Sequence, residues 1–116
     1  FNVNSLAQAA ALAGLSDKSH LVGLRKIIGQ GKAYLIKNFK EMKLKFIPSA
    51  ANFILLDLKQ NSLPITNGLL KQGVIVRNMV GWGLPNFIRV TVGTMRENKK
   101  FIKELRSQMR TRFSER

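Results

Sequence analysis

The segment NFIRVTVGT, residues 86–94, alternates apolar and polar side chains around one arginine, Arg89. Successive side chains of a strand point to opposite faces of the sheet. Alternation of this kind predicts a half-buried strand. One face would carry the apolar residues Ile88, Val90 and Val92. Arg89 therefore lies on the other face, turned away from the core together with Phe87 and Thr91.

A helix is expected directly after this strand. Thr94 and Glu97 form a T-x-x-E capping box, in which each side chain satisfies a free backbone donor of the first helical turn. The apolar stripe that follows is spaced as on one face of a helix, and it consists of Phe101, Ile102, Leu105 and Met109.

Three further helices and several strands are predicted upstream. Ser5 and Gln8 form a capping box for a short helix that ends near Gly14, and a long helix starts between residues 16 and 19. Its apolar positions are Leu21, Leu24, Ile28, Leu35, Phe39 and Met42, while Gly23, Gly29 and Gly31 suggest a bend or close packing.

Pro64 suits the first turn of a third helix that Gly73 would end. The predicted strands are LKFIPS (44–49), ANFILLDL (51–58), GVIVR (73–77) and FIRVTV (87–92), with a loop over residues 78–86.

These elements predict one α/β (α+β) sandwich, a small and largely antiparallel sheet of three or four strands packed with helices. A length of 116 residues suits one domain, and a hydrophobic content of 45% argues against disorder. The absence of Cys and the single His20 exclude disulfides, thiolate nucleophiles and Cys-rich zinc sites, and no metal site is expected. No apolar run is long enough for a membrane helix, so we expect no membrane partner and a cytoplasmic location.

The net charge of +14 raises the alternative of a basic nucleic-acid-binding module. The basic residues are scattered over several helix faces, however, and few aromatic residues are interleaved with them as stacking platforms. Nucleic-acid binding is therefore the less favoured interpretation.

Arg77 ends the predicted strand VIVR, and a loop of hairpin type separates it from Arg89. Both guanidinium groups could then lie at one rim of the sheet. Guanidinium groups match the geometry of carboxylate and phosphate, so two arginines there would suit a doubly anionic small molecule. The second interpretation is that each arginine snorkels to solvent or pairs with an acid such as Asp57.

Four segments resemble the C-terminal part of histidinol-phosphate aminotransferases, within the fold type I, pyridoxal-phosphate-dependent aminotransferases. They are FNVNSLAQAAALAGL, PSAANFILLDL, GVIVRNMVGWGLPNFIRVTVGT and ENKKFIKEL. The resemblance runs from Phe1 to Leu105, and its most specific portion is GVIVR followed by GLPN and IRVTVGT. It implies that residues 1–116 are the small C-terminal domain, with residues 1–15 as the linker helix from a large domain.

The resemblance also implies site residues. Arg89 matches the arginine that binds the substrate α-carboxylate, and Arg77 matches the one that binds the phosphate of histidinol phosphate. Asn4 borders the cleft, and Asn52 either approaches the substrate or holds the strand turn. Trp82 stands where Tyr or Phe is common, which could reshape the substrate pocket.

The implied activity is amino transfer between glutamate and imidazole-acetol phosphate in histidine biosynthesis, or a related transamination of another amino acid. The family needs a lysine that forms a Schiff base with pyridoxal phosphate, and no lysine here has the matching context. The chain also begins at Phe1 without Met, as a piece of a longer protein would. We therefore expect the cofactor and catalytic residues in a large domain, a homodimer of the full-length enzyme, and a 116-residue chain that alone binds no cofactor and is inactive.

Overall fold

The computed structural model describes residues 2–113. Four helices are present in this range: α1 (Ser5–Ser16), α2 (Lys18–Glu41), α3 (Ser62–Lys71) and α4 (Met95–Phe113). Four strands accompany them: β1 (Lys45–Ile47), β2 (Phe53–Asp57), β3 (Arg77–Met79) and β4 (Leu84–Thr91). A single turn of 3-10 helix, η1 (Val80–Trp82), joins β3 to β4.

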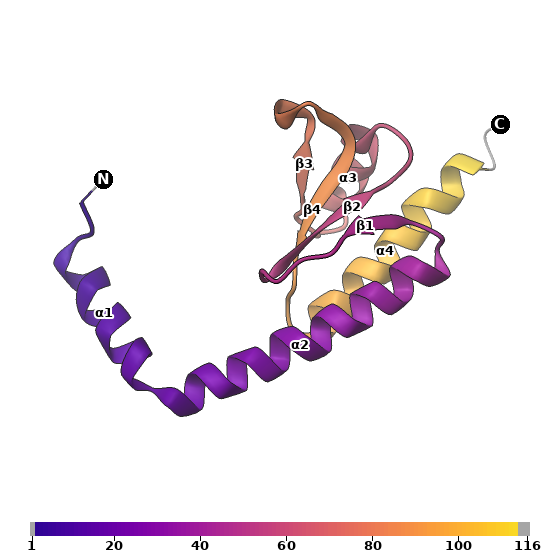
Figure 1. The fold of residues 1–116 in the computed structure, drawn as a ribbon. Helices are drawn as coiled ribbons and strands as arrows, with labels where there is room; N and C mark the ends of the chain where they lie inside the picture. Colours follow the sequence, from indigo (N-terminus) through magenta and orange to yellow (C-terminus); the bar gives the residue numbers. More distant parts are fainter. Residues whose placement is uncertain (1, 114–116) are drawn as a thin grey trace.

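The strands form one sheet in the order β1-β2-β4-β3, and every neighbouring pair is antiparallel. The C-terminal half of α2 lies beside α4, and α3 packs against α4, β4 and β3 (Figure 1). These helices cover one face of the sheet. The predicted α/β sandwich with a small antiparallel sheet is confirmed, with four strands.

The core lies between the sheet and the three helices. Ile88 and Val90 of β4 face it, as the alternation of residues 86–94 predicts, and Thr91 is exposed. Leu35 and Phe39 contribute the inner face of α2, and Phe39 packs edge-on against Phe101 of α4. The other fully or nearly fully buried apolar residues are Leu44, Ile54, Leu56, Leu58, Ile65, Leu69, Val92, Ile102 and Leu105.

The junction between β4 and α4 is tied by side chains. The carboxamide of Asn98, which is 2% exposed, donates from Nδ2 to the carbonyl of Gly93 (2.9 Å) and accepts from its N–H (3.0 Å). The capping box is confirmed: the carboxylate of Glu97 accepts from the Thr94 N–H and hydroxyl, both at 2.7 Å. These bonds lower the pKa of Glu97 below its ordinary value. Strand and helix are thereby held in a fixed relation.

Gly31 lets α2 approach this junction closely. A Cβ atom at Gly31 would lie 2.6 Å from Asn98 Nδ2 and 2.7 Å from Val92 Cγ1. The expectation of close packing is therefore right at Gly31. At Gly23 and Gly29 a Cβ would meet nothing within 4 Å, and α2 continues through all three glycines.

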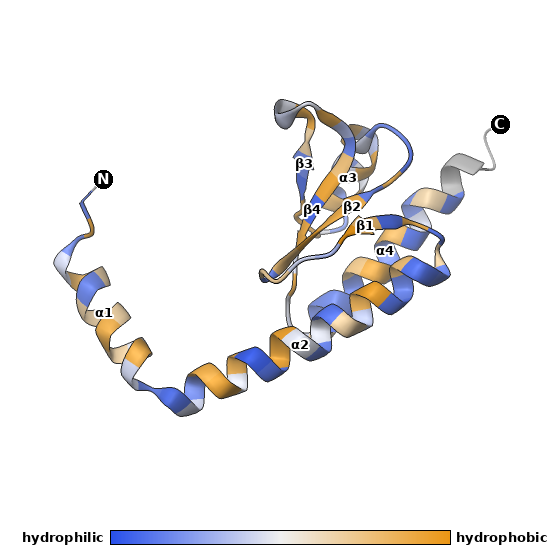
Figure 2. Ribbon diagram, in the orientation of Figure 1, coloured by the Kyte–Doolittle hydropathy of each residue, from blue (hydrophilic) through white to orange (hydrophobic). Residues whose placement is uncertain are grey.

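Helix α1 and the first half of α2 extend away from the sheet, which gives the chain a long dimension of 55 Å (Figure 1). We call residues 3–27 the arm. Hydrophobic residues recur along it (Figure 2). Those with exposed side chains include Leu6, Leu12, Leu15, Val22, Leu24 and Ile27. Leu24 has the helical spacing of the other apolar positions of α2 and is nevertheless exposed, because no described element covers this part of the helix. Within residues 2–113, no helix combines the length and apolar character that crossing a membrane requires.

Three predicted boundaries are wrong. The N-cap of α1 is Asn4, one residue before the predicted Ser5, because the Asn4 side chain accepts from the Ala7 N–H. The predicted strand 73–77 begins only at its last residue, Arg77, and residues 74–76 line a cavity of ≈ 360 Å³ together with residues at the end of β4. The predicted loop 78–86 shrinks to a tight turn, in which Gly83 adopts a left-handed φ of 73°.

Two glycines of α2 should respond oppositely to alanine. Gly31→Ala forces its methyl group against Asn98 and Val92, and we expect a loss of about 1–3 kcal/mol in the free energy of unfolding. Gly29→Ala places its methyl in open space and should raise stability by up to about 1 kcal/mol through helix propensity. Urea denaturation of both variants measures this, and a Gly31→Ala variant as stable as the wild type would contradict the close packing at Gly31.

Candidate anion-binding site

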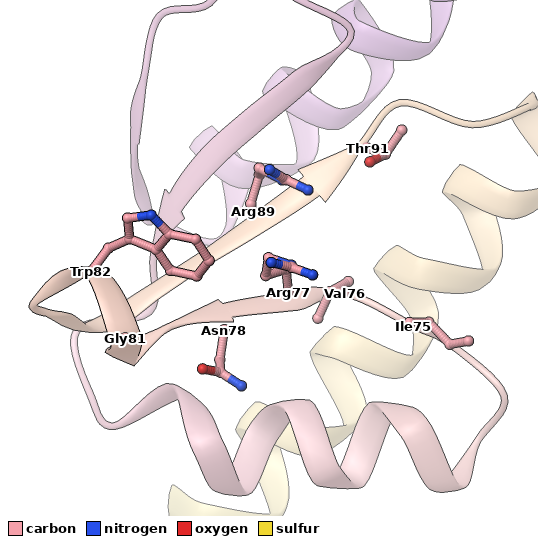
Figure 3. A pocket seen from close by; sticks show the side chains of 8 residues that line it. All are labelled: Ile75, Val76, Arg77, Asn78, Gly81, Trp82, Arg89 and Thr91. Atoms are coloured by element: carbon pink, nitrogen blue, oxygen red, sulfur yellow. The ribbon is translucent and has the colours of Figure 1, made fainter. Parts of the chain in front are cut away.

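A groove of ≈ 600 Å³ opens beside β3 and β4, on the side of the sheet away from α3 (Figure 3). Strand β3, the residues just before it, the η1 turn and the second half of β4 form its walls. It is lined by Ile75, Val76, Arg77, Asn78, Gly81, Trp82, Arg89 and Thr91. Asn78 points away from the two arginines, toward the helical side (Figure 3).

Arg77 and Arg89 are direct cross-strand partners in the β3–β4 ladder. Their side chains therefore emerge side by side on one face, and both guanidinium groups line the groove (Figure 3). The prediction that the two arginines share one rim of the sheet is confirmed. Like charges placed directly opposite each other in a sheet repel and destabilise it.

No acid in the described part of the chain neutralises this pair. The ion pairs found there join Lys103 to Glu104 and Arg106 to Glu41. Asp57 instead accepts a hydrogen bond from the Lys59 N–H, so the interpretation that it pairs with an arginine is not supported. Two cations at one rim without a carboxylate make this groove a candidate site for an external anion.

Each arginine lies over an aromatic ring. The Arg77 Cζ is 5.5 Å from the centroid of Trp82, in the η1 turn, and the Arg89 Cζ is 5.4 Å from the centroid of Phe53, in β2. Contacts of this type are worth about 0.5–1 kcal/mol each at exposed positions. The rings thus support the guanidinium groups without consuming their N–H donors.

The other two predicted site residues lie outside the groove. The side chain of Asn4 caps α1, and Asn52, which is exposed, accepts a hydrogen bond from the Val92 N–H through its backbone carbonyl. Any contact of either residue with a substrate stays a prediction. Phe53 is a residue that sequence reasoning missed, because its place under Arg89 follows only from the β2–β4 register, in which Leu55 pairs with Arg89 and Phe53 with Thr91.

The residues that line the groove include no lysine and no carboxylate. Three lysines donate to backbone carbonyls elsewhere: Lys32 to Ser49, Lys59 to Lys43 and Lys100 to Gly73. The groove can therefore bind and orient an anion, but it offers no nucleophilic amine and no acid-base pair.

Comparison with known proteins is consistent with this arrangement. A family model described as "Aminotransferase class I and II" matches residues 1–105. The chain belongs to this family. Histidinol-phosphate aminotransferase 1 of Nitrosococcus oceani is 50% identical over 105 residues, which are 90% of this chain and 28% of that protein. Histidinol-phosphate aminotransferase of Moorella thermoacetica is 45% identical over 106 residues, 91% of this chain and 28% of that protein.

Two solved structures share the fold. The histidinol-phosphate aminotransferase of Clostridium acetobutylicum superposes with a TM-score of 0.81 at 23% identity, over 91% of this chain and 33% of that one. An L-threonine-O-3-phosphate decarboxylase of Porphyromonas gingivalis gives 0.75 at 23% identity, over 93% and 35%. The resemblance stated from the sequence is confirmed, and the chain spans 28% of the length of the two histidinol-phosphate aminotransferases of N. oceani and M. thermoacetica.

Repulsion between the paired arginines should be visible in stability. Arg77→Gln removes one of two adjacent like charges, so we expect unchanged or higher stability at low salt, by up to about 1 kcal/mol. The gain should shrink as added salt screens the charges. Thermal melts across a salt series measure it, with Arg110→Gln, at an exposed position of α4, as the control for net charge. Equal salt responses in the two variants would mean that the pair does not interact.

Proposed function

We propose that this chain is the C-terminal small domain of a histidinol-phosphate aminotransferase and supplies the arginines that bind its substrates. The observation that carries the proposal is the cross-strand pair Arg77 and Arg89, which lines a groove without any acid. The identity of 50% to a histidinol-phosphate aminotransferase supports the choice of substrate.

In this proposal the two arginines bind different anions. Arg89 is half-buried on the central strand β4 and would bind the α-carboxylate of each amino acid substrate through two parallel N–H bonds. Arg77 is exposed on the edge strand and would bind the phosphate of histidinol phosphate. Glutamate has no phosphate, so the same groove would accept it through Arg89 alone. Holding the substrate at two points would fix the orientation of its reacting carbon.

The chain would depend on a large domain and a dimer partner. The apolar side chains of the arm are the surface we assign to contact with the large domain, with residues 1–15 as the linker helix. This is supported by the exposure of the arm and by the fraction of the relatives that the chain covers, 28% for the first of them. A cytoplasmic homodimer of the full-length protein completes the proposal.

Pyridoxal phosphate, which the family implies, does not fit the groove itself. A site for that cofactor needs a lysine amine and a carboxylate beside the pyridine nitrogen, and the lining residues include neither. The cofactor would be held by the rest of the enzyme, where it supplies the amino-group chemistry. The contribution of this chain is to bind and orient the substrates.

Substitution of Arg77 should separate the two substrates. In the full-length enzyme, Arg77→Ala should lose about 1.5–3 kcal/mol of transition-state stabilisation for histidinol phosphate, because a charge-assisted contact disappears, and should spare glutamate. Values of kcat/KM for both substrates measure this, with Arg110→Ala as the control for lost charge. Equal losses for both substrates would remove the phosphate-specific role of Arg77.

Substitution of Arg89 should affect both substrates alike. We expect Arg89→Lys to be nearly as damaging as Arg89→Ala, because an ammonium group is a point charge that cannot reproduce the paired N–H bonds of a guanidinium. Folding should change little, since Arg89 lies on the open face of the sheet. The comparison is kcat/KM beside thermal melts. A factor of ten in kcat/KM corresponds to ~1.4 kcal/mol. If kcat/KM of the Lys variant stays within about threefold of the wild-type value, Arg89 acts only as a generic positive charge.

The 116-residue chain by itself should neither hold the cofactor nor transaminate. After incubation with pyridoxal phosphate and borohydride, we expect no lysine to be labelled selectively, and glutamate should not be turned over. Peptide mass spectrometry of the reduced chain checks this. Selective labelling of one lysine would contradict the assignment of the chemistry to the large domain.

A further inference from the structure

We propose that Trp82 is the positioning residue that holds the Arg77 guanidinium ready for a phosphate monoester, and that it thereby contributes to substrate selectivity. The inference rests on the proposed function of Arg77 and concerns a residue for which no role has been assigned. This role is supported by the position of the indole against the guanidinium, by the surroundings of Arg77, and by the short turn that places Trp82 beside it.

The turn between β3 and β4 fixes where the indole lies. The η1 turn spans three residues. It is closed by a hydrogen bond of 3.0 Å that the Gly83 N–H donates to the Val80 carbonyl. Gly83 then adopts a left-handed φ of 73°, which a residue with a side chain adopts only with strain. Trp82 is thereby brought back along β3 until its ring lies under the Arg77 Cζ at 5.5 Å (Figure 3).

Burial in the core does not explain this tryptophan. Its side chain is 59% exposed, and it does not belong to the hydrophobic core. Its ring contacts the Arg77 guanidinium, and both residues line the same groove. The indole is therefore placed to act on the guanidinium.

Arg77 needs such support more than Arg89 does. It is exposed, it begins the edge strand β3, and a register shift follows at Asn78 and Met79. Arg89 is half-buried in the central strand and lies over Phe53 of a neighbouring strand. A long exposed arginine loses much rotamer freedom when it binds an anion, and a ring that already restricts it reduces that loss.

Stacking and anion binding do not compete for the same part of the guanidinium. The aromatic ring contacts the flat face, whereas the N–H donors point outward in the plane. A phosphate monoester can therefore be bound bidentately at the edge while Trp82 remains on the face. A carboxylate at Arg89 would be indifferent to Trp82, so the effect should be specific for the phosphorylated substrate.

The test uses kcat/KM of the full-length enzyme for histidinol phosphate and for glutamate. Trp82→Ala should lower the value for histidinol phosphate about two- to fivefold, the worth of one exposed cation–π contact, and leave glutamate unchanged. Trp82→Phe should restore most of the loss. Trp82→Leu, which keeps an apolar side chain without a π face, should behave like Ala. Leu70→Ala, 57% exposed on α3 and outside the groove, is the matched control.

A double-mutant cycle completes the design. If Trp82 acts through Arg77, adding Trp82→Ala to Arg77→Ala should cause no further loss. Full additivity, a Leu variant equal to wild type, or an equal loss for glutamate would overturn the positioning role while leaving the proposed function intact. If Arg77→Ala alone leaves histidinol phosphate unaffected, the phosphate role of Arg77 fails and the inference fails with it. Thermal melts of each variant separate these outcomes from loss of folding.

Discussion

The alternation of side chains along β4 is the constraint on which the rest of the structure depends. This strand is hydrogen-bonded on both sides, to β2 and to β3, so its register fixes that of the whole sheet. Burying Ile88 and Val90 against the helices forces Arg89 to the opposite face. A slip of one residue would turn the arginine into the core, where an unpaired charge is not tolerated. The fold and the groove are therefore set by the same strand.

The groove combines features that lower stability with features that permit binding. Two guanidinium groups stand opposite each other on adjacent strands, and no acid within the described residues offsets their repulsion. The rings of Trp82 and Phe53 support the cations without occupying their hydrogen-bond donors. An anion bound between the two groups would offset this repulsion, which is the basis for proposing the pair as a binding site.

The groove also depends on a rigid connection behind it. Asn98 binds both backbone groups of Gly93, and Gly31 brings α2 against the same point. The end of β4 is thus tied to α4 by two hydrogen bonds, and α2 packs closely against this junction at Gly31. In the proposed function, a substrate-binding arginine on β4 would gain its precision from this support, because a misplaced binding group would misorient the substrate. The exposed apolar arm, by contrast, receives no comparable support from the described residues.

The sequence by itself determined the fold class, the faces of β4, the Thr94–Glu97 cap and the identity of both arginines, because these follow from local periodicity and local hydrogen bonding. It also carried the family resemblance in GLPN and IRVTVGT. Only the tertiary structure decided that Arg77 pairs directly with Arg89, that Phe53 lies under Arg89, and that residues 74–76 stay out of the sheet. Strand register and the packing of distant segments involve residues far apart in the chain, and no local pattern specifies them. For the same reason Leu24 has the spacing of a core residue and yet lies exposed, since burial depends on what covers a face and not on the face alone.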